Sequence, residues 1–200
     1  MVRIPSSELQ AIALFTADKN EVRYYMCGVH ITSNQIQATN GHIVGRLSYP
    51  ISGGEEIPEK GILIDGKAIA DLFRGMTAKE KRDSIVSITI EPGDFIKLEC
   101  RGRTVISNLD FNQYPDVDRV LPEDAQFTGE AFNVVRLNWE YMALFQKVAD
   151  ILKKKKRSKT VFTDVDLYLN SNPEGVARVL IPGAETFNGV IMPMRRETGE

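Results

Sequence analysis

The chain has 200 residues, of which 42% are hydrophobic and 26% are charged, and its formal net charge is -2. This composition is ordinary for a globular protein, and the bulk charge gives no reason to predict a nucleic-acid binder. The length suits one large domain or two small ones. No apolar run reaches membrane-spanning length and the first residues lack the apolar core of a signal peptide, so we expect a cytoplasmic protein.

The first predicted unit begins with a helix near Ser6. Ser7 and Gln10 have the spacing of a capping box, and the run to Asp18 is rich in Leu, Ile and Ala. Strand-like stretches follow at Val22–Ser33, Gln35–Thr39 and His42–Tyr49.

The second unit opens with a predicted strand at Gly61–Ile64, and Asp65 is a plausible helix cap. The following helix carries one apolar stripe at Ile69, Leu72, Phe73 and Met76. Turn residues separate three further strands at Ile85–Ile90, Phe95–Cys100 and Thr104–Leu109.

The third unit opens with a predicted strand at Ala131–Leu137 and a cap at Asn138, after a linker at Gln113–Gln126. The apolar face of its helix comprises Tyr141, Leu144, Phe145, Val148 and Leu152. The predicted strands of this unit are Thr160–Leu169, Gly175–Ile181 and Gly189–Met194.

The pattern is therefore an α+β fold built from three β-α-β-β-β units, repeating roughly every 60 residues. One unit cannot cover its own sheet and helix faces, so units should pack in pairs. An odd number leaves one sheet edge uncovered, which predicts that another subunit completes the structure.

The sequence offers little for catalysis. Cys27 and Cys100 lie in apolar runs without a CxxC pair, so we expect two reduced core thiols. His30 and His42 have no Cys or carboxylate cluster at ligand spacing, so no metal site is predicted. With no P-loop, nucleophile elbow or convincing carboxylate pair, we expect no enzyme and no cofactor.

Three segments are more specific. They read EVRYYMCGV at Glu21–Val29 with ATNGH at Ala38–His42, YPDVDRVLP at Tyr114–Pro122, and VIMPMR at Val190–Arg195. In this order they resemble segments of the bacterial DNA polymerase III β-subunit (sliding clamp) family. Taken singly, Val190–Met194 would be interpreted as a core strand and His42 as a structural histidine.

The resemblance implies a DNA-clamp fold, with helices lining a central hole and sheets outside. Residues 1–122 would form a complete clamp domain of two units, and residues 123–200 a half domain ending in VIMPMR. It also implies a groove that binds short hydrophobic peptides of polymerases and the clamp loader. The corresponding residues are Arg23, Met26, Thr39, Gly41, His42, Val44, Pro115, Arg119, Val120, Val190, Ile191, Met192, Pro193, Met194 and Arg195. Asn40, Ile43 and Asp118 depart from the usual family residues, and Arg196–Glu200 extends past the usual end.

Cations gather where a clamp would face DNA. Lys67, Arg74 and Lys81 recur every seven residues away from the apolar stripe, and Lys147 and Lys154 do the same on the third helix. A dense basic run comprises Lys153, Lys154, Lys155, Lys156, Arg157 and Lys159. Phosphate contact without base reading is one interpretation. A solvated helix end that complements the helix dipole is the other.

The resulting hypothesis is a sliding clamp that encircles duplex DNA regardless of sequence and tethers a polymerase. Rings of this superfamily contain twelve units, so three units per chain favour a homotetramer of roughly 90 kDa, and a homotrimer is the alternative. The short chain suggests a viral or mobile-element origin. The rival hypothesis is a regulator or decoy that keeps the peptide groove and does not encircle DNA.

Overall fold

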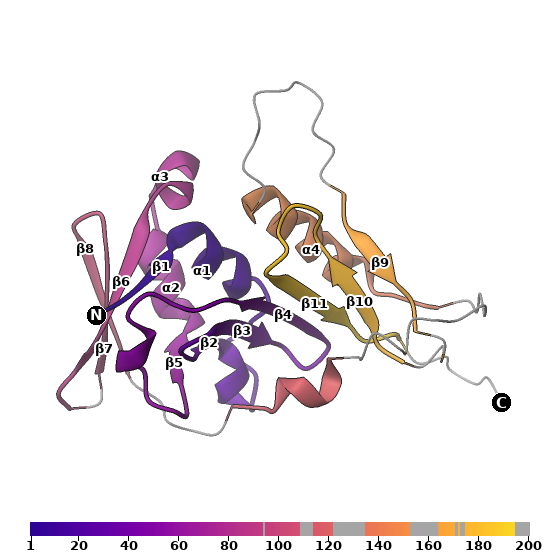
Figure 1. Ribbon diagram of the computed structural model, residues 1–200, viewed down its shortest axis with the longest axis horizontal. Helices are drawn as coiled ribbons and strands as arrows, with labels where there is room; N and C mark the ends of the chain where they lie inside the picture. The colour runs from indigo at the N-terminus through magenta and orange to yellow at the C-terminus, as the bar shows by residue number, and fades with distance from the viewer. Residues whose placement is uncertain are drawn as a thin grey trace.

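Two antiparallel sheets and a set of helices make up the fold (Figure 1). This computed structural model describes residues 1–93, 95–108, 114–121, 135–152, 164–170, 172 and 175–194. One sheet has the strand order β1-β6-β7-β8, and the other has the order β5-β2-β3-β4-β11-β10-β9. The elements are β1 (Val2–Pro5), α1 (Ser6–Ala13), η1 (Tyr24–Cys27), β2 (Gly28–Ile31), β3 (Gln35–Thr39), β4 (Ile43–Ser48), η2 (Gly54–Glu56), β5 (Ile62–Asp65), α2 (Gly66–Phe73), α3 (Ala78–Arg82), β6 (Ile85–Glu91), β7 (Phe95–Cys100), β8 (Arg103–Asn108), η3 (Val117–Val120), α4 (Trp139–Leu152), β9 (Asp166–Tyr168), β10 (Ala177–Leu180) and β11 (Phe187–Ile191).

The predicted duplication is visible in the element boundaries. Strands β1, β3 and β4 and helix α1 begin at residues 2, 35, 43 and 6, while β5, β7, β8 and α2 begin at residues 62, 95, 103 and 66. The shift is 60 residues for each of these four pairs, so β4 and β8 occupy the same place in two copies of one unit.

Opening strands are exchanged between these two copies. Strand β1 pairs antiparallel with β6, and β5 pairs antiparallel with β2. Each copy therefore closes the sheet of the other. The third unit joins differently, because its last strand β11 pairs with β4 and extends the same sheet.

Aromatic packing fixes this junction between the first and third units, where α4 lies beside α1 (Figure 1). Phe15, Phe145 and Phe187 are fully buried, with ring centroids 5.1 to 6.4 Å apart. Gly45 of β4 lies opposite Gly189 of β11 and makes room for these rings. A Cβ atom at Gly45 would lie 2.3 Å from the Phe15 ring.

Two of the three predicted caps are confirmed. The side chains of Asp65 and Asn138 accept hydrogen bonds from the backbone N–H groups of Lys67 and Glu140. The capping box at Ser7 is wrong, because Pro5 precedes α1 and no side chain caps it. Helix α1 instead begins against the second unit, where buried Ser6 donates to the Ser84 carbonyl at 2.8 Å.

Other boundaries also differ. Residues Tyr24–Cys27 form the 3-10 turn η1 where a strand was predicted, because their backbone closes a turn in which Met26 N–H donates to the Arg23 carbonyl. Helix α2 ends at Phe73, so Met76 is buried beyond it, and Lys81 belongs to the separate helix α3.

Part of the predicted third unit lies outside the described residues. This includes most of Ala131–Leu137, of which the described residues 135–137 are not in a strand. Of the two free thiols, Cys100 is buried and Cys27 is half-buried. Within the described part of the chain, no helix is long and apolar enough to cross a membrane.

Candidate functional site: a groove at the β4–β11 junction

The three specific segments of the sequence meet at one pocket on the chain. It lies beside the first residues of β4, the last residues of β11 and the turn η3, and has a volume of about 180 Å³. This is smaller than a typical small-molecule site of roughly 300–1,000 Å³. It offers room for one or two apolar side chains of a larger partner.

The floor of the pocket is an apolar cluster on the face of the sheet opposite α1 and α4. Val44 of β4 and Val190 of β11 are paired across the junction, and both are buried. Tyr114, Val117 and Leu63 complete the cluster. Turn η3 therefore covers this face of the sheet, on the side away from the helices (Figure 1).

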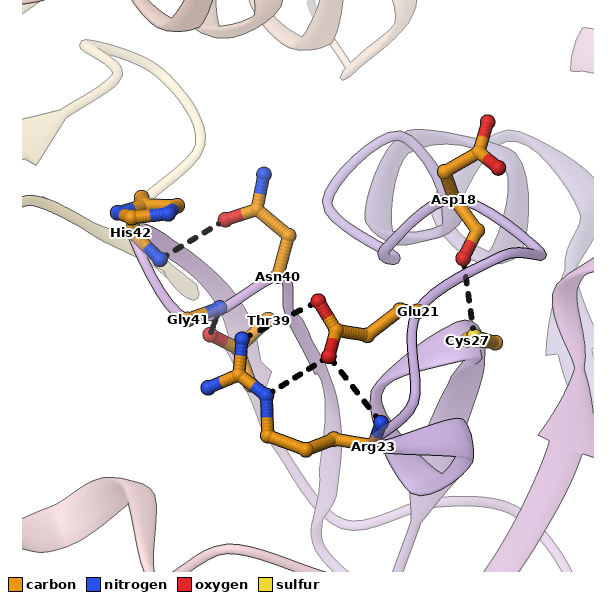
Figure 2. A network of polar contacts seen from close by, with 8 residues as sticks. All are labelled: Asp18, Glu21, Arg23, Cys27, Thr39, Asn40, Gly41 and His42. Atoms are coloured by element: carbon orange, nitrogen blue, oxygen red, sulfur yellow. Dashed lines mark hydrogen bonds and ion pairs between the residues drawn. The ribbon is translucent and has the colours of Figure 1, made fainter.

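One rim of the pocket is a fixed arginine. Arg23 Nε lies 2.9 Å from Oε1 of Glu21, and this ion pair lowers the pKa of the Glu21 carboxyl to about 2 (Figure 2). The guanidinium group lies over Gly41, where an added Cβ atom would meet Arg23 Nη1 at 3.3 Å. Gly41 also has a φ of +90°, which favours glycine, so it permits this close approach.

The turn before β4 is held by its own side chains (Figure 2). Asn40 Oδ1 accepts hydrogen bonds from the backbone N–H groups of His42 and Ile43. Thr39 Oγ1 donates to the Ile43 carbonyl and accepts from Gly41 N–H. Asn40, a departure from the family pattern, therefore forms the turn that places His42 at the rim.

The opposite rim is formed by the chain after β11. Met192 N–H donates to the His42 carbonyl at 2.9 Å, and Met194 N–H donates to the Arg136 carbonyl at 2.8 Å. Both methionine side chains are substantially exposed, at 38% for Met192 and 55% for Met194. Such flexible, polarisable side chains suit a surface that accommodates different partners.

A buried polar network ties η3 to the sheet beneath the pocket. Arg46 of β4 is buried and its guanidinium donates to Asp118 at 2.6 Å and to Gln37 at 3.0 Å. Gln37 contacts Nδ1 of His30, whose Nε2 lies 3.0 Å from the Lys60 carbonyl. Asp118, another departure from the family pattern, is thus the counter-ion of a buried arginine.

The structure brings most of the predicted groove residues together, with exceptions. Ile191 faces the main core, Arg119 points outward and pairs with Asp116, and Arg195 lies outside the described residues. Pro193 and Met194 do not line the pocket. The predicted residues that line it are Arg23, Met26, Thr39, Gly41, His42, Val44, Pro115, Val120, Val190 and Met192.

Some residues at the site were missed. Ile43, Asp116 and Val117 line the pocket, and Tyr141 of α4 stacks on His42 with ring centroids 5.8 Å apart. The helical spacing assigns Tyr141 only to the apolar face of its helix. Tyr141 packs against the core and also stacks on His42 because of how α4 packs in the folded chain. The spacing of residues along the helix does not indicate the second contact.

No family model and no curated protein matches this chain in sequence. Solved structures match closely in fold. A DNA polymerase sliding clamp from Pseudomonas aeruginosa is 20% identical with a TM-score of 0.65, and covers 97% of this chain and 65% of its own. The Caulobacter crescentus pol III beta is 17% identical with a TM-score of 0.68, and covers 98% of this chain and 65% of its own.

The chain has the fold of the bacterial sliding clamp. A further clamp with this fold, from Bartonella birtlesii and bound to griselimycin, has a TM-score of 0.67 at 17% identity and covers 97% of this chain. The chain spans just under two thirds of the length of these clamps, at 65%. The shortened clamp fold agrees with the fold class that the repeated units predicted.

The helix surfaces expected to face DNA carry mixed charge. Lys67 and Arg74 are exposed, but Arg74 pairs with Asp71, and Lys81 is half-buried. Lys147 is exposed on α4 near the acidic residue Asp150. The basic run Lys153, Lys154, Lys155, Lys156, Arg157 and Lys159 lies outside the described residues.

Proposed function

We propose that this chain is a sliding clamp, a non-enzymatic factor that encircles duplex DNA and tethers polymerase and other partners through the β4–β11 groove. The observation that carries the proposal is the combination of the clamp fold with an apolar pocket where the three motif segments meet. The relatives supply the fold only, so partner and DNA binding rest on the chemistry of this chain.

The groove suits a short hydrophobic peptide from a polymerase or clamp loader. Buried Val44 and Val190 provide an apolar floor, and Met192 provides an adaptable wall. Arg23 and His42 stand at the rim, where they can bind peptide carbonyls or a carboxylate. An extended segment with one or two large apolar side chains would satisfy both parts of the site.

Peptide binding can be tested with fluorescently labelled short peptides that contain Leu and Phe. Met192→Ala should weaken binding about tenfold, equivalent to about 1.4 kcal/mol, because Met192 lines the pocket. Met194→Ala should have a smaller effect, since Met194 lies beyond the lining. Phe95→Ala, an exposed residue of β7 in the other sheet, is the matched control. Unchanged affinity in Met192→Ala would remove the groove assignment.

Ring formation is proposed from the open sheet edges. β8 and β9 lie at opposite ends of the molecule and terminate the two sheets among the described residues (Figure 1). Three units per chain favour a homotetramer of roughly 90 kDa, with a homotrimer as the alternative. Light scattering across a dilution series distinguishes them.

DNA contact is proposed mainly for the basic run Lys153–Lys156. Changing these four lysines to glutamate should reduce retention of the loaded ring on DNA and flatten its salt dependence. Peptide affinity should stay at the wild-type value. Unchanged retention would assign the run to the solvated helix end.

The second candidate is a regulator that binds peptides without encircling DNA. The mixed charge of the described helix faces, with Asp71 and Asp150 among the cations, favours it over a plain clamp. A persistent monomer that still binds peptide would support this candidate.

A further inference from the structure

Strand β8 is an unguarded sheet edge. It ends the four-stranded sheet, and its central residues Thr104, Val105 and Ile106 are all β-branched. Ile106 is 66% exposed. Natural proteins usually blunt such edges with lysine, proline or a bulge, and residues 104–107 contain neither lysine nor proline. The free edge of β8 can therefore form backbone hydrogen bonds with a strand of another chain.

The chain itself shows how a strand in this place pairs. Strand β4 is the counterpart of β8 in the first unit, and it pairs antiparallel with β11, the last strand of the third unit. Gly45 lies opposite Gly189 at the centre of that pairing. Shifted by 60 residues, the position of Gly45 becomes Val105 on β8. In the β4–β11 contact, the last strands of two units thus pair around Gly45, and Val105 holds the same position on β8.

The surface beside β8 is also hollow. A cavity of about 510 Å³ runs along residues 105–108 and reaches Leu63, Tyr24 and the first turns of α2. Tyr24 is 54% exposed there. This cavity is larger than the peptide groove, and the two share no lining residue. It would accept side chains of a partner seated on the edge.

We propose that β8 pairs antiparallel with β8 of a second copy, about a two-fold axis at Val105. Val105 then lies opposite Val105 of the second copy, Thr104 opposite its Ile106, and Arg103 opposite its Ser107. The two four-stranded sheets become one continuous sheet. This β8–β8 contact would be one of the contacts that close the proposed ring. It rests on the proposed function only in that the ring is part of that function.

The sequence of β8 is self-complementary in this register. Residues 105 and 107 point inward and 104 and 106 outward, so each pair shares one face of the sheet, as antiparallel pairing requires. Cross-strand pairs of β-branched residues such as Thr104 and Ile106 stabilise a sheet. Arg103 lies opposite a serine of the second copy and therefore meets no like charge. In each copy Asp65 lies next to Ser107, so Arg103 also approaches the Asp65 of the second copy.

A two-fold contact has a consequence for stoichiometry. In this contact each β8 edge is occupied by the β8 edge of one other copy, so copies joined through β8 come in pairs. A closed ring that contains this contact has an even number of chains. The homotetramer is then allowed, and the homotrimer is excluded.

The test uses matched lysine substitutions in the full chain. Ile106→Lys places a charge on the edge and should halve the mass measured by light scattering, with peptide affinity unchanged. Ile85→Lys is the control, because Ile85 is also exposed, at 57%, on the same face of the same sheet but away from the edge. An unchanged mass in folded Ile106→Lys, or a wild-type mass of one or three chains, would overturn the proposal.

Cross-linking tests the register. Val105→Cys should form an interchain disulfide under mild oxidation, because the axis brings the two Cβ atoms to about 5 Å. Arg103→Cys should not, since its copies lie on opposite sides of the axis. No cross-link above wild type in Val105→Cys overturns the register. If the mass test fails while peptide binding and DNA retention persist, only the β8 contact falls. If β8 cross-links and DNA is not retained, the proposed function falls instead.

Discussion

Strands β4 and β8 hold the same place in two copies of one unit, yet one is an internal junction and the other an open edge (Figure 1). Residues 43–47 of β4 are all buried, whereas residues 103–106 of β8 are exposed or half-buried. Each strand pairs antiparallel with the strand before it, β3 for β4 and β7 for β8. The difference therefore comes from the residues that each strand carries and from what surrounds them.

On the inner face, the positions of the large and the small residue are reversed between the two copies. The first unit has Gly45 on the strand and Phe15 after the helix, and 60 residues later the second unit has Val105 and Gly75. The glycine on β4 accommodates the Phe15 ring, which packs on Phe145 of the third unit. On β8, valine fills part of that space itself. A glycine paired with an aromatic residue thus distinguishes the junction from the edge.

On the outer face, the contrast is one of charge. Arg46 of β4 is buried because Asp118 of η3 and Gln37 of β3 hold it. Its counterpart on β8 is Ile106, which is left exposed. The polar network brings η3 over β4 and so creates the peptide groove. No described element covers β8 in this way.

The largest predicted effect is loss of the aromatic cluster. Phe145→Ala should lower the free energy of unfolding by about 3–5 kcal/mol, as expected for a fully buried phenylalanine. Hydrogen exchange should rise first in β9, β10 and β11, because Phe145 joins the third unit to the first. Equal acceleration in β6, β7 and β8 would show that the junction is not a separate source of stability.

A smaller effect is expected from adding one carbon on β4. Gly45→Ala should cost about 2 kcal/mol, since its Cβ atom meets the buried Phe15 ring at 2.3 Å. The matched change Val105→Ala on β8 removes atoms at a half-buried site and should cost less than about 1 kcal/mol in the separated chain. Denaturant titrations of both variants measure the comparison. Equal costs would contradict the contrast between the two strands.

Much of this architecture could be predicted because it depends on local signals. The spacing of apolar residues and the caps Asp65 and Asn138 identified the repeated unit, and strand β7 was predicted with both boundaries correct. These features follow from periodicity, which is contained in short stretches of sequence.

The misses arise where distant residues decide the outcome. Ser7 had the spacing of a cap, but α1 begins at Ser6, which is bonded to a carbonyl 78 residues away. Asp118 could be recognised as unusual, while its partner Arg46 lies 72 residues earlier. Tyr141 was predicted as core and also stacks on His42. Sequence spacing indicates a face of a helix, whereas only packing decides what that face meets.

The smallest predicted effect concerns pH and the network under the groove. Burial lowers the pKa of His30, and nearby Arg46 lowers it further, while the Lys60 carbonyl partly opposes them. The ring centroids of Tyr114 and His30 are 4.6 Å apart, and the Gln37 side chain contacts Nδ1 of His30. These contacts fix the position of the neutral imidazole. No counterpart of this network covers β7 and β8 among the described residues.

Because the folded chain binds the His30 proton less tightly than the unfolded chain, acid favours unfolding through this group. Its contribution to stability should be complete above about pH 6.5 and be lost as the pH falls through the lowered pKa. His30→Gln should flatten this part of the stability profile. Hydrogen exchange should place the acid-induced loosening in β3, β4 and η3, with β7 and β8 unaffected. Loosening of β8 at the same pH would mean that the two strands share one source of stability after all.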